Sequence, residues 1–136
     1  DIRAEAIENT NKNIQPLIYA SDIDPQCIEI ARENARRAGV DKLIRFECID
    51  MNNLKPYTDK ATIVCNPPYG ERLLEKREAE KLYRQMGEKF ARFSGAAKYI
   101  ITSHPSFENC YGAKADKKRK IYNGMLKCYL YQYFKI

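Results

Sequence analysis

Short apolar runs alternate with amphipathic segments along most of the chain, a pattern that predicts strands alternating with helices. The apolar runs predict strands over residues 16–21, 43–49, 61–65 and 97–102. Residues 1 to about 13 have a weak helical period followed by a polar stretch, so a short helix running into a loop is expected there. Asp24 as the N-cap and Pro25 in the first turn predict a longer helix over residues 25–38, which ends before Gly39.

The second half of the chain predicts one long helix and a hairpin. Residues 75–93 carry an apolar stripe at helical spacing, which predicts core packing and no chemistry. Residues 119–122 and 125–134 alternate as strands do, and the intervening Asn123-Gly124 is a strong hairpin signal. The fold class predicted is therefore α/β and Rossmann-like, a mostly parallel sheet with one reversed strand at its end. The stripe consists of Ala79, Leu82, Tyr83, Met86, Phe90 and Phe93.

Polar residues follow three of the predicted strands. Asp22, Asp50 and Asn66 each stand where an apolar run stops. Open α/β sheets bind their ligands at the carboxyl ends of their strands, so the three residues are expected to line one rim.

The segment Asn66-Pro67-Pro68-Tyr69 carries the most specific chemistry. It follows the run 61–65, which predicts a buried strand. The Asn66 side-chain oxygen and the Pro67 carbonyl are acceptors that could hold both N–H groups of an exocyclic amine and aim its lone pair. Neither proline has a competing N–H, and Tyr69 offers a flat face on which an unstacked base can rest. A plain strand-ending turn with a half-buried aromatic is the structural alternative.

Composition narrows the class of protein without naming a reaction. The 136 residues are 44% hydrophobic and 31% charged, which is typical of a soluble globular protein of one domain. No signal peptide and no apolar stretch long enough to span a bilayer is visible, so a cytoplasmic protein is expected. The five cysteines are odd in number and lack metal-ligand or redox spacing, so we expect reduced, buried thiols and no metal.

The net charge of +6 favours an anionic partner, of which RNA is the usual one. Much of the excess lies between Lys114 and Lys120, where Lys118 and Arg119 precede the hairpin turn. A solvated loop before a strand is the alternative interpretation of this run.

These motifs together resemble one family. The chain is similar to S-adenosylmethionine-dependent methyltransferases that modify a guanine N2 amine in large-subunit ribosomal RNA and carry an RNA-binding THUMP domain upstream. The resemblance covers nearly the whole chain, as the C-terminal part of the catalytic domain. The Asn-Pro-Pro-Tyr core is shared with adenine-N6 and protein-glutamine methyltransferases. The extension Gly70-Glu71-Arg72-Leu73, together with the hairpin Tyr122-Asn123-Gly124, is much more specific to this family. The segments concerned are Ser21–Pro25, Glu33–Val40, Asp50, Asn66–Leu73 and Arg119–Gly124.

The resemblance implies roles for the residues of the methyl-donor site. Asp22 would bind the ribose hydroxyls of S-adenosyl-L-methionine, a task that suits a carboxylate. Ile23 would pack on the adenine ring, and Asp50 would accept from its amino group beside Met51. Turn or helix-capping roles are the alternative for Asp22 and Asp50, and capping is the role expected of Asp24.

The resemblance also implies roles on the substrate side. Asn66, Pro67, Pro68 and Tyr69 would orient the amine and the base, and ribosomal RNA would be the partner. Arg72 would contact an RNA phosphate or pair with Glu71 or Glu75. Lys118 and Arg119 would contact RNA. His104 precedes Pro105 after a strand and is expected to be structural, because the methylated amine can release its proton to water.

One departure from the family pattern matters. Such methyltransferases place a Gly-x-Gly loop after a first, central strand, and neither precedes Asp22, since Gly39 is the first glycine. We therefore expect a partial methyltransferase domain over residues 1–136, from a longer protein whose RNA-binding domain lies upstream, and weak donor binding by this piece alone. The alternatives are a degenerate relative and a non-catalytic RNA-binding module.

Overall fold

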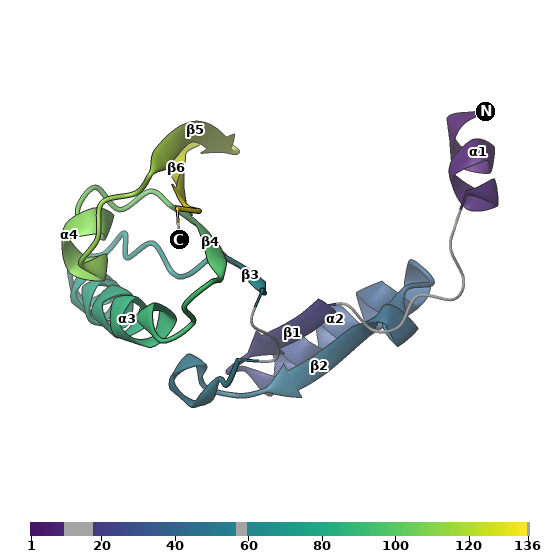
Figure 1. Cartoon of the computed structure of the whole chain (residues 1–136), viewed down its shortest axis with the longest axis horizontal. Coiled ribbons are helices and arrows are strands. Elements are labelled where there is room, and N and C mark those ends of the chain that lie inside the picture. The colour runs from purple at the N-terminus through teal and green to yellow at the C-terminus, as the bar shows by residue number, and fades with distance from the viewer. Residues whose placement is uncertain (10–17, 57–59, 136) are drawn as a thin grey trace. The chain divides into compact units, whose positions relative to one another are not determined.

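The chain forms two compact units, Asp1–Asn53 and Leu54–Ile136, each of which is described by itself. The structure is a computed structural model that describes residues 1–9, 18–56 and 60–135 (Figure 1). The first two residues of the strand predicted over 16–21 lie outside this range. No helix in the described part of the chain is long and apolar enough to cross a membrane.

The first unit contains a β-α-β crossover. After α1 (Ile2–Glu8), the strands β1 (Ile18–Asp22) and β2 (Ile44–Cys48) run parallel, with Asp22 opposite Cys48. Helix α2 (Pro25–Arg37) connects them and is followed by the short 3₁₀ turns η1 (Asp41–Leu43) and η2 (Met51–Asn53). The Asp24 side chain accepts from the Gln26 N–H at 2.9 Å, so the predicted capping role of Asp24 is confirmed.

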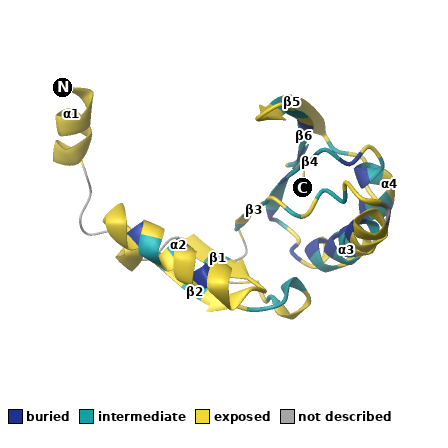
Figure 2. Ribbon diagram, turned by 180° about the vertical axis from the view of Figure 1, so that it is seen from behind, coloured by how far each residue is buried: buried dark blue, intermediate teal, exposed yellow. Residues whose placement is uncertain are grey.

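The first unit buries little apolar surface. Ile28 and Ala35 of α2 are its buried apolar residues among those described, and β1 leaves Ile18 55% and Tyr19 43% exposed. Exposed residues accordingly predominate over β1, β2 and α2 in Figure 2. Because apolar burial is the main favourable term in folding, this unit has little of its own to offset its conformational entropy.

The second unit contains a four-stranded sheet covered by helices. Its elements are β3 (Thr62–Cys65), α3 (Leu73–Ala91), β4 (Ala97–Thr102), α4 (Phe107–Tyr111), β5 (Lys117–Asn123) and β6 (Leu126–Tyr133). The strand order is β3-β4-β6-β5; β3 and β4 are parallel, and β6 is antiparallel to both its neighbours. The predicted antiparallel C-terminal hairpin is confirmed. The reversed strand, β6, lies between β4 and β5, and β5 forms the outer edge.

The core of the second unit packs α3 and α4 on this sheet. Five of the six residues of the predicted stripe are buried, and Leu82 is half-buried; Phe93 lies two residues beyond the end of α3. They meet a cluster of aromatic rings from α4 and β6, in which the Phe107 ring lies 5.0 Å from that of Tyr83 and 4.7 Å from that of Tyr131. Aromatic pairs at these distances contribute beyond their buried area. The sequence analysis did not predict α4, whose five residues are too few to show a helical period.

Three predictions of detail are wrong. Strand β3 is not buried, since Val64 is 75% exposed and one edge of the strand is unpaired within the described residues. The hairpin turn is centred on Gly124 and Met125, one residue later than predicted, because Asn123 still pairs with Leu126. Gly124 has φ +66° at the first central position, where type II′ turns favour glycine.

The third concerns the cysteines, which were expected to be buried. Cys128 is buried, Cys65 and Cys110 are half-buried, and Cys27 and Cys48 are exposed. The small core of the first unit explains the difference, because it offers Cys27 and Cys48 little to pack against.

Candidate active site

The ends of β1 and β2 bring two aspartates to one edge of the first unit. Asp22 ends β1, and its carbonyl accepts from the Ile49 N–H at 3.0 Å, one residue past the end of β2. Asp50 follows directly. The first unit therefore brings together the two carboxylates that the sequence analysis assigned to the donor side.

Each aspartate uses one carboxylate oxygen to shape its own turn. Asp22 Oδ1 accepts from the Asp24 N–H at 2.9 Å, and Asp50 Oδ1 accepts from the Asn52 N–H at 2.8 Å. The turn-capping alternative is therefore real for both residues. Within the described residues the second oxygen of each carboxylate accepts no hydrogen bond, so it can still accept from a hydroxyl or an amine.

The residues next to these aspartates offer apolar surface. Ile23 is 67% exposed although its carbonyl accepts from the Cys48 thiol at 3.5 Å. Met51 is half-buried at the start of η2. Ile23 therefore offers exposed apolar surface next to Asp22, and Met51 offers some next to Asp50.

The second unit carries the Asn66–Tyr69 motif where β3 ends. Strand β3 stops at Cys65, Asn66 is exposed, and Tyr69 is half-buried. Burial raises the pKa of the Cys65 thiol to about 12, so this thiol stays protonated and is no nucleophile. The candidate chemistry at this strand end therefore belongs to the motif.

Gly70 holds the chain against α3 directly after the motif. Its φ is +71°, and a side-chain β-carbon there would lie 2.8 Å from Lys76 Cα and 2.9 Å from Ala79 Cβ. Both the backbone conformation and the close approach to α3 require glycine. The direction in which the chain leaves the motif is therefore fixed by packing.

The hairpin reaches the motif from the other side. Asn123, at the end of β5, donates from Nδ2 to the Tyr69 hydroxyl at 3.4 Å. Burial raises the pKa of Tyr69, and hydrogen bonding to Asn123 opposes that rise. Two of the segments on which the family resemblance rests therefore meet in space, at the ring proposed to hold a base.

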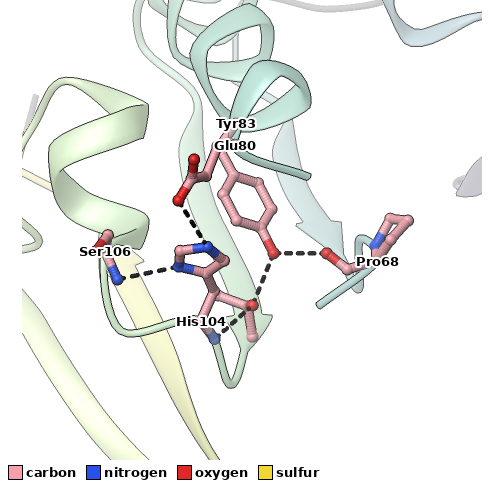
Figure 3. A network of polar contacts seen from close by, with 6 residues as sticks. Pro68, Glu80, Tyr83, His104 and Ser106 are labelled. Carbon is pink, nitrogen blue, oxygen red and sulfur yellow. Dashed lines mark hydrogen bonds and ion pairs between the residues drawn. The ribbon is translucent and has the colours of Figure 1, made fainter. Parts of the chain in front are cut away.

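A third group of residues, which the sequence analysis missed, supports the motif from the core (Figure 3). The Tyr83 hydroxyl donates to the Pro68 carbonyl at 2.5 Å and lies 2.9 Å from Thr102 Oγ1. His104 is buried beside them, and its Nε2 lies 3.2 Å from Glu80 Oε1. The sequence held one signal for this group, a tyrosine inside an apolar stripe, because a buried hydroxyl needs a partner.

The three basic residues expected to contact RNA have different surroundings. Arg72 is exposed at the start of α3, and no ion pair joins it to Glu71 or Glu75 among the described residues. Lys118 lies 3.5 Å from Glu108 and 5.1 Å above the Tyr129 ring, so its position is partly fixed. Arg119 is exposed on the opposite face of β5. Arg72 and Arg119 are thus the freer cations.

A hollow of the first unit lies away from the strand-end residues, and no metal site is found among the described residues. This hollow is lined by residues of α2 and β2, among them Arg32, Glu33 and Phe46, and includes none of the strand-end residues. In the described part of the chain, no three histidine, cysteine or acidic side chains gather to hold a metal ion.

Comparison with known proteins identifies relatives of the whole chain. Residues 1–132 match the family described as RMKL-like, methyltransferase domain. The chain is 44% identical over 133 residues to "Putative RNA methyltransferase YpsC" of Bacillus subtilis, covering 97% of this chain and 34% of that protein. It is 39% identical over 131 residues to "Ribosomal RNA large subunit methyltransferase K/L" of Legionella pneumophila, covering 96% of this chain and 18% of that one.

Solved structures agree with these relatives. A methyltransferase crystallised as a complex with SAH superposes with a TM-score of 0.92 at 40% identity, covering 99% of this chain and 36% of that one. A predicted N6-adenine-specific DNA methylase from Listeria monocytogenes superposes at 0.87 and 41% identity, with 98% and 34% covered. The α/β methyltransferase fold is confirmed. The chain spans about a third of the length of YpsC and less of the K/L enzyme.

Proposed function

Because this chain belongs to the RMKL-like methyltransferase domain family, we propose that it carries part of a site that methylates an exocyclic guanine amine in large-subunit ribosomal RNA. The methyl donor proposed is S-adenosylmethionine. The SAH complex of a relative supports this donor, since SAH is what remains after the methyl group has left. The names of the K/L relatives support the RNA substrate.

The donor fits the residues of the first unit. Asp22 has one carboxylate oxygen fixed by the Asp24 N–H, which leaves the other to accept from ribose hydroxyls. Asp50 is fixed in the same way and would accept from the adenine amino group, while Ile23 and Met51 cover the ring. When bound, S-adenosylmethionine supplies a methyl group activated by its positive sulfur.

On the substrate side, the second unit would orient the amine. The Asn66 side-chain oxygen and the Pro67 carbonyl would accept from the two N–H groups of the amine, which fixes the direction of its lone pair. The nitrogen–carbon bond forms as the carbon–sulfur bond breaks, and the nitrogen then gives one proton to water. Tyr69, held by Asn123, stacks on the base. No strong base is needed.

The observation that carries this proposal is the motif itself: an exposed asparagine and two N–H-free prolines at a strand end, with an aromatic ring fixed beside them. Such a surface offers acceptors without competing backbone donors. Arg72, Lys118 and Arg119 are proposed to contact RNA phosphates, which supply sequence-independent affinity. Upstream RNA-binding segments of the same protein are a further proposed partner.

The test is methyl transfer from labelled S-adenosylmethionine to undermodified ribosomal RNA by the full-length protein. Asn66→Ala should lower kcat by about 10²-fold, the scale for losing one preorganised group. Asn109→Ala, an exposed asparagine of α4, is the matched control and should retain the wild-type rate. An unchanged rate for Asn66→Ala would contradict the proposed role.

Adenine N6 is the competing target, because the related Listeria protein is described as a predicted N6-adenine-specific DNA methylase. Both amines are planar and conjugated, so the same acceptors serve either. Identification of the methylated nucleoside by mass spectrometry separates the two. A protein glutamine substrate would give a labelled protein and no labelled RNA.

A further inference from the structure

A chain of buried polar groups runs from the core of the second unit to the Pro68 carbonyl (Figure 3). Tyr83 and Thr102 are fully buried, and His104 is 3% exposed. The His104 backbone N–H donates to Thr102 Oγ1 at 3.1 Å, and Thr102 Oγ1 lies 2.9 Å from the Tyr83 hydroxyl. The Tyr83 hydroxyl lies 2.5 Å from the Pro68 oxygen.

The hydrogen bonds of this chain can have only one direction. The Pro68 oxygen is an acceptor, so Tyr83 must donate its single proton to it. Because the Tyr83 proton is used in this bond, Thr102 Oγ1 must donate its own proton to Tyr83, while it accepts from the His104 backbone N–H. Each group thus donates toward the motif, and bonds aligned in this way strengthen one another.

The His104 ring is fixed by a second set of contacts. Its Nδ1 accepts from the Ser106 N–H at 3.0 Å, and its Nε2 lies 3.2 Å from Glu80 Oε1 without a hydrogen bond between them. The ring also meets that of Tyr83 edge to face, with centroids 5.5 Å apart. These contacts hold His104, whose backbone N–H donates the first hydrogen bond of the series that continues through Thr102 and Tyr83.

The Tyr83 bond controls one of the backbone torsions of the motif that the prolines leave free. Their rings fix φ at Pro67 and Pro68, and each proline restricts ψ of the residue before it, here Asn66 and Pro67. The ψ angle of Pro68 has no such covalent restriction. The position of the Pro68 carbonyl defines this angle, and Tyr83 holds that carbonyl.

Packing does not replace this bond. Asn66 and Pro68 are exposed, and Pro67 and Tyr69 are half-buried. The other anchor is Gly70, which contacts Lys76 and Ala79. With Tyr83, these residues lie three and four positions apart on one face of α3. One face of α3 therefore holds the chain at Pro68 and again at Gly70.

We propose that Tyr83 is a positioning residue: its hydroxyl, oriented by Thr102, sets the Pro68 carbonyl and so aligns Asn66, Pro67 and Tyr69 on the substrate. This inference rests on the proposed methyl transfer for its kinetic consequence. The hydroxyl touches no reacting atom. Its loss should therefore lower kcat and leave donor affinity unchanged, because the residues proposed to bind the donor lie in the first unit.

The test compares two tyrosine-to-phenylalanine variants of the full-length protein. Tyr83→Phe removes the bond to Pro68, and Tyr133→Phe removes a like bond to the Ala113 carbonyl at 2.8 Å, which is distant from the motif in sequence. Tyr83→Phe should lower kcat about tenfold with unchanged KM for the donor, since small losses of orientation cost this much. Tyr133→Phe should retain the wild-type kcat at a similar melting temperature.

A second pair of variants separates positioning from folding. Thr102→Val keeps the shape of the residue but leaves the Tyr83 hydroxyl without its donor, and Thr102→Ser restores that donor. We expect kcat to fall in the valine variant and to return in the serine variant. Equal rates in the two, at equal stability, would overturn the role of Thr102.

Amide hydrogen exchange provides a readout that does not depend on the substrate. Exchange at Tyr69 and Gly70 should be about threefold faster in Tyr83→Phe than in Tyr133→Phe, because the turn opens locally. Equal exchange and equal kcat in these two variants would overturn the inference. Wild-type protein that methylates no RNA would instead contradict the proposed function, and the exchange result would still decide the role of Tyr83.

Discussion

Asp22 and Asp24 show how neighbouring residues of one type can have different tasks. Asp24 caps α2 through Gln26, while Asp22 braces the turn with one oxygen and keeps the other available. Both are exposed. Because the two residues are close together, removing the charge of either one changes the local electrostatic potential by nearly the same amount. Asp24 is therefore a suitable control for substitutions at Asp22.

We predict that Asp22→Asn weakens binding of S-adenosylmethionine to the full-length protein by about tenfold or more, as expected when a charged hydrogen bond is lost. Asp24→Asn should bind normally, since asparagine is an equally good N-cap. Isothermal titration calorimetry measures both affinities. Equal weakening in the two variants would mean that only general charge matters at this turn.

Gly70 is the residue on which the path of the chain after the motif depends. Gly70→Ala should lower the free energy of unfolding by roughly 2–4 kcal/mol, from the left-handed φ together with overlap with α3. Gly112→Ala is the control, because its φ is +90° but a β-carbon there meets nothing within 4 Å. It should cost about 1 kcal/mol. Urea unfolding of both variants checks the difference, and equal costs would show that α3 yields without penalty.

At the scale of elements, α3 connects the motif to the rest of the second unit. It contacts the motif through Tyr83, it lies against Gly70 directly after the motif, and it contacts α4 through Gly87. A β-carbon at Gly87 would lie 1.9 Å from the Tyr111 carbonyl oxygen, so the two helices can approach this closely only at a glycine. The position of α4 therefore depends on one residue of α3.

Gly87→Ala should accordingly destabilise the second unit, although alanine favours helix in general. We expect a loss of about 1–3 kcal/mol, the usual cost of overpacking. Glu88→Ala, on the exposed side of the same helix, should be neutral or slightly stabilising. Thermal unfolding of the two variants gives the comparison, in which a stable Gly87→Ala protein would show that α4 can move away freely.

The helices with clear periodicity and the strand over residues 97–102 could be predicted from the sequence, because local pattern decides such elements. The hairpin was found for the same reason, but its turn was misplaced by one residue. Pairing of Asn123 with Leu126 is set by contacts across the sheet. The exposure of Val64 and of Cys48 depends on what covers a strand, which no local pattern reports.

The candidate site divides in the same way. Asp22, Asp50 and the Asn66 motif could be found from composition at strand ends together with family resemblance. The role of Tyr83 could not be found in this way, because a tyrosine in an apolar stripe is typical of a hydrophobic core. Its role follows from a contact between residues fifteen apart in sequence, which only the packing of α3 reveals. Whether Asn66 joins the two aspartates at one rim stays a prediction.

At the scale of the whole molecule, the tyrosine-rich core of the second unit makes stability depend on alkaline pH. Burial raises the pKa of Tyr111 and of Tyr131 to about 12, whereas tyrosine in an unfolded chain titrates near 10. Between these values the unfolded chain binds fewer protons than the folded one. The free energy of unfolding must therefore fall as the pH rises through this window.

We predict this fall between about pH 10 and about pH 12, measured by urea unfolding followed by circular dichroism. Tyr131→Phe should make the fall shallower because one such group is removed. Tyr122→Phe, which alters a ring that is 63% exposed, should leave the slope unchanged. A slope that is the same in all three proteins would show that Tyr131 ionises equally in both states.

The most direct test of the central claim identifies the methylated atom. Undermodified ribosomal RNA is incubated with full-length protein and S-adenosylmethionine, digested to nucleosides and analysed by mass spectrometry. We predict that the wild-type protein produces N2-methylguanosine and that Asn66→Ala produces much less of it. Methylation of another atom, or equal yields from the two proteins, would contradict it.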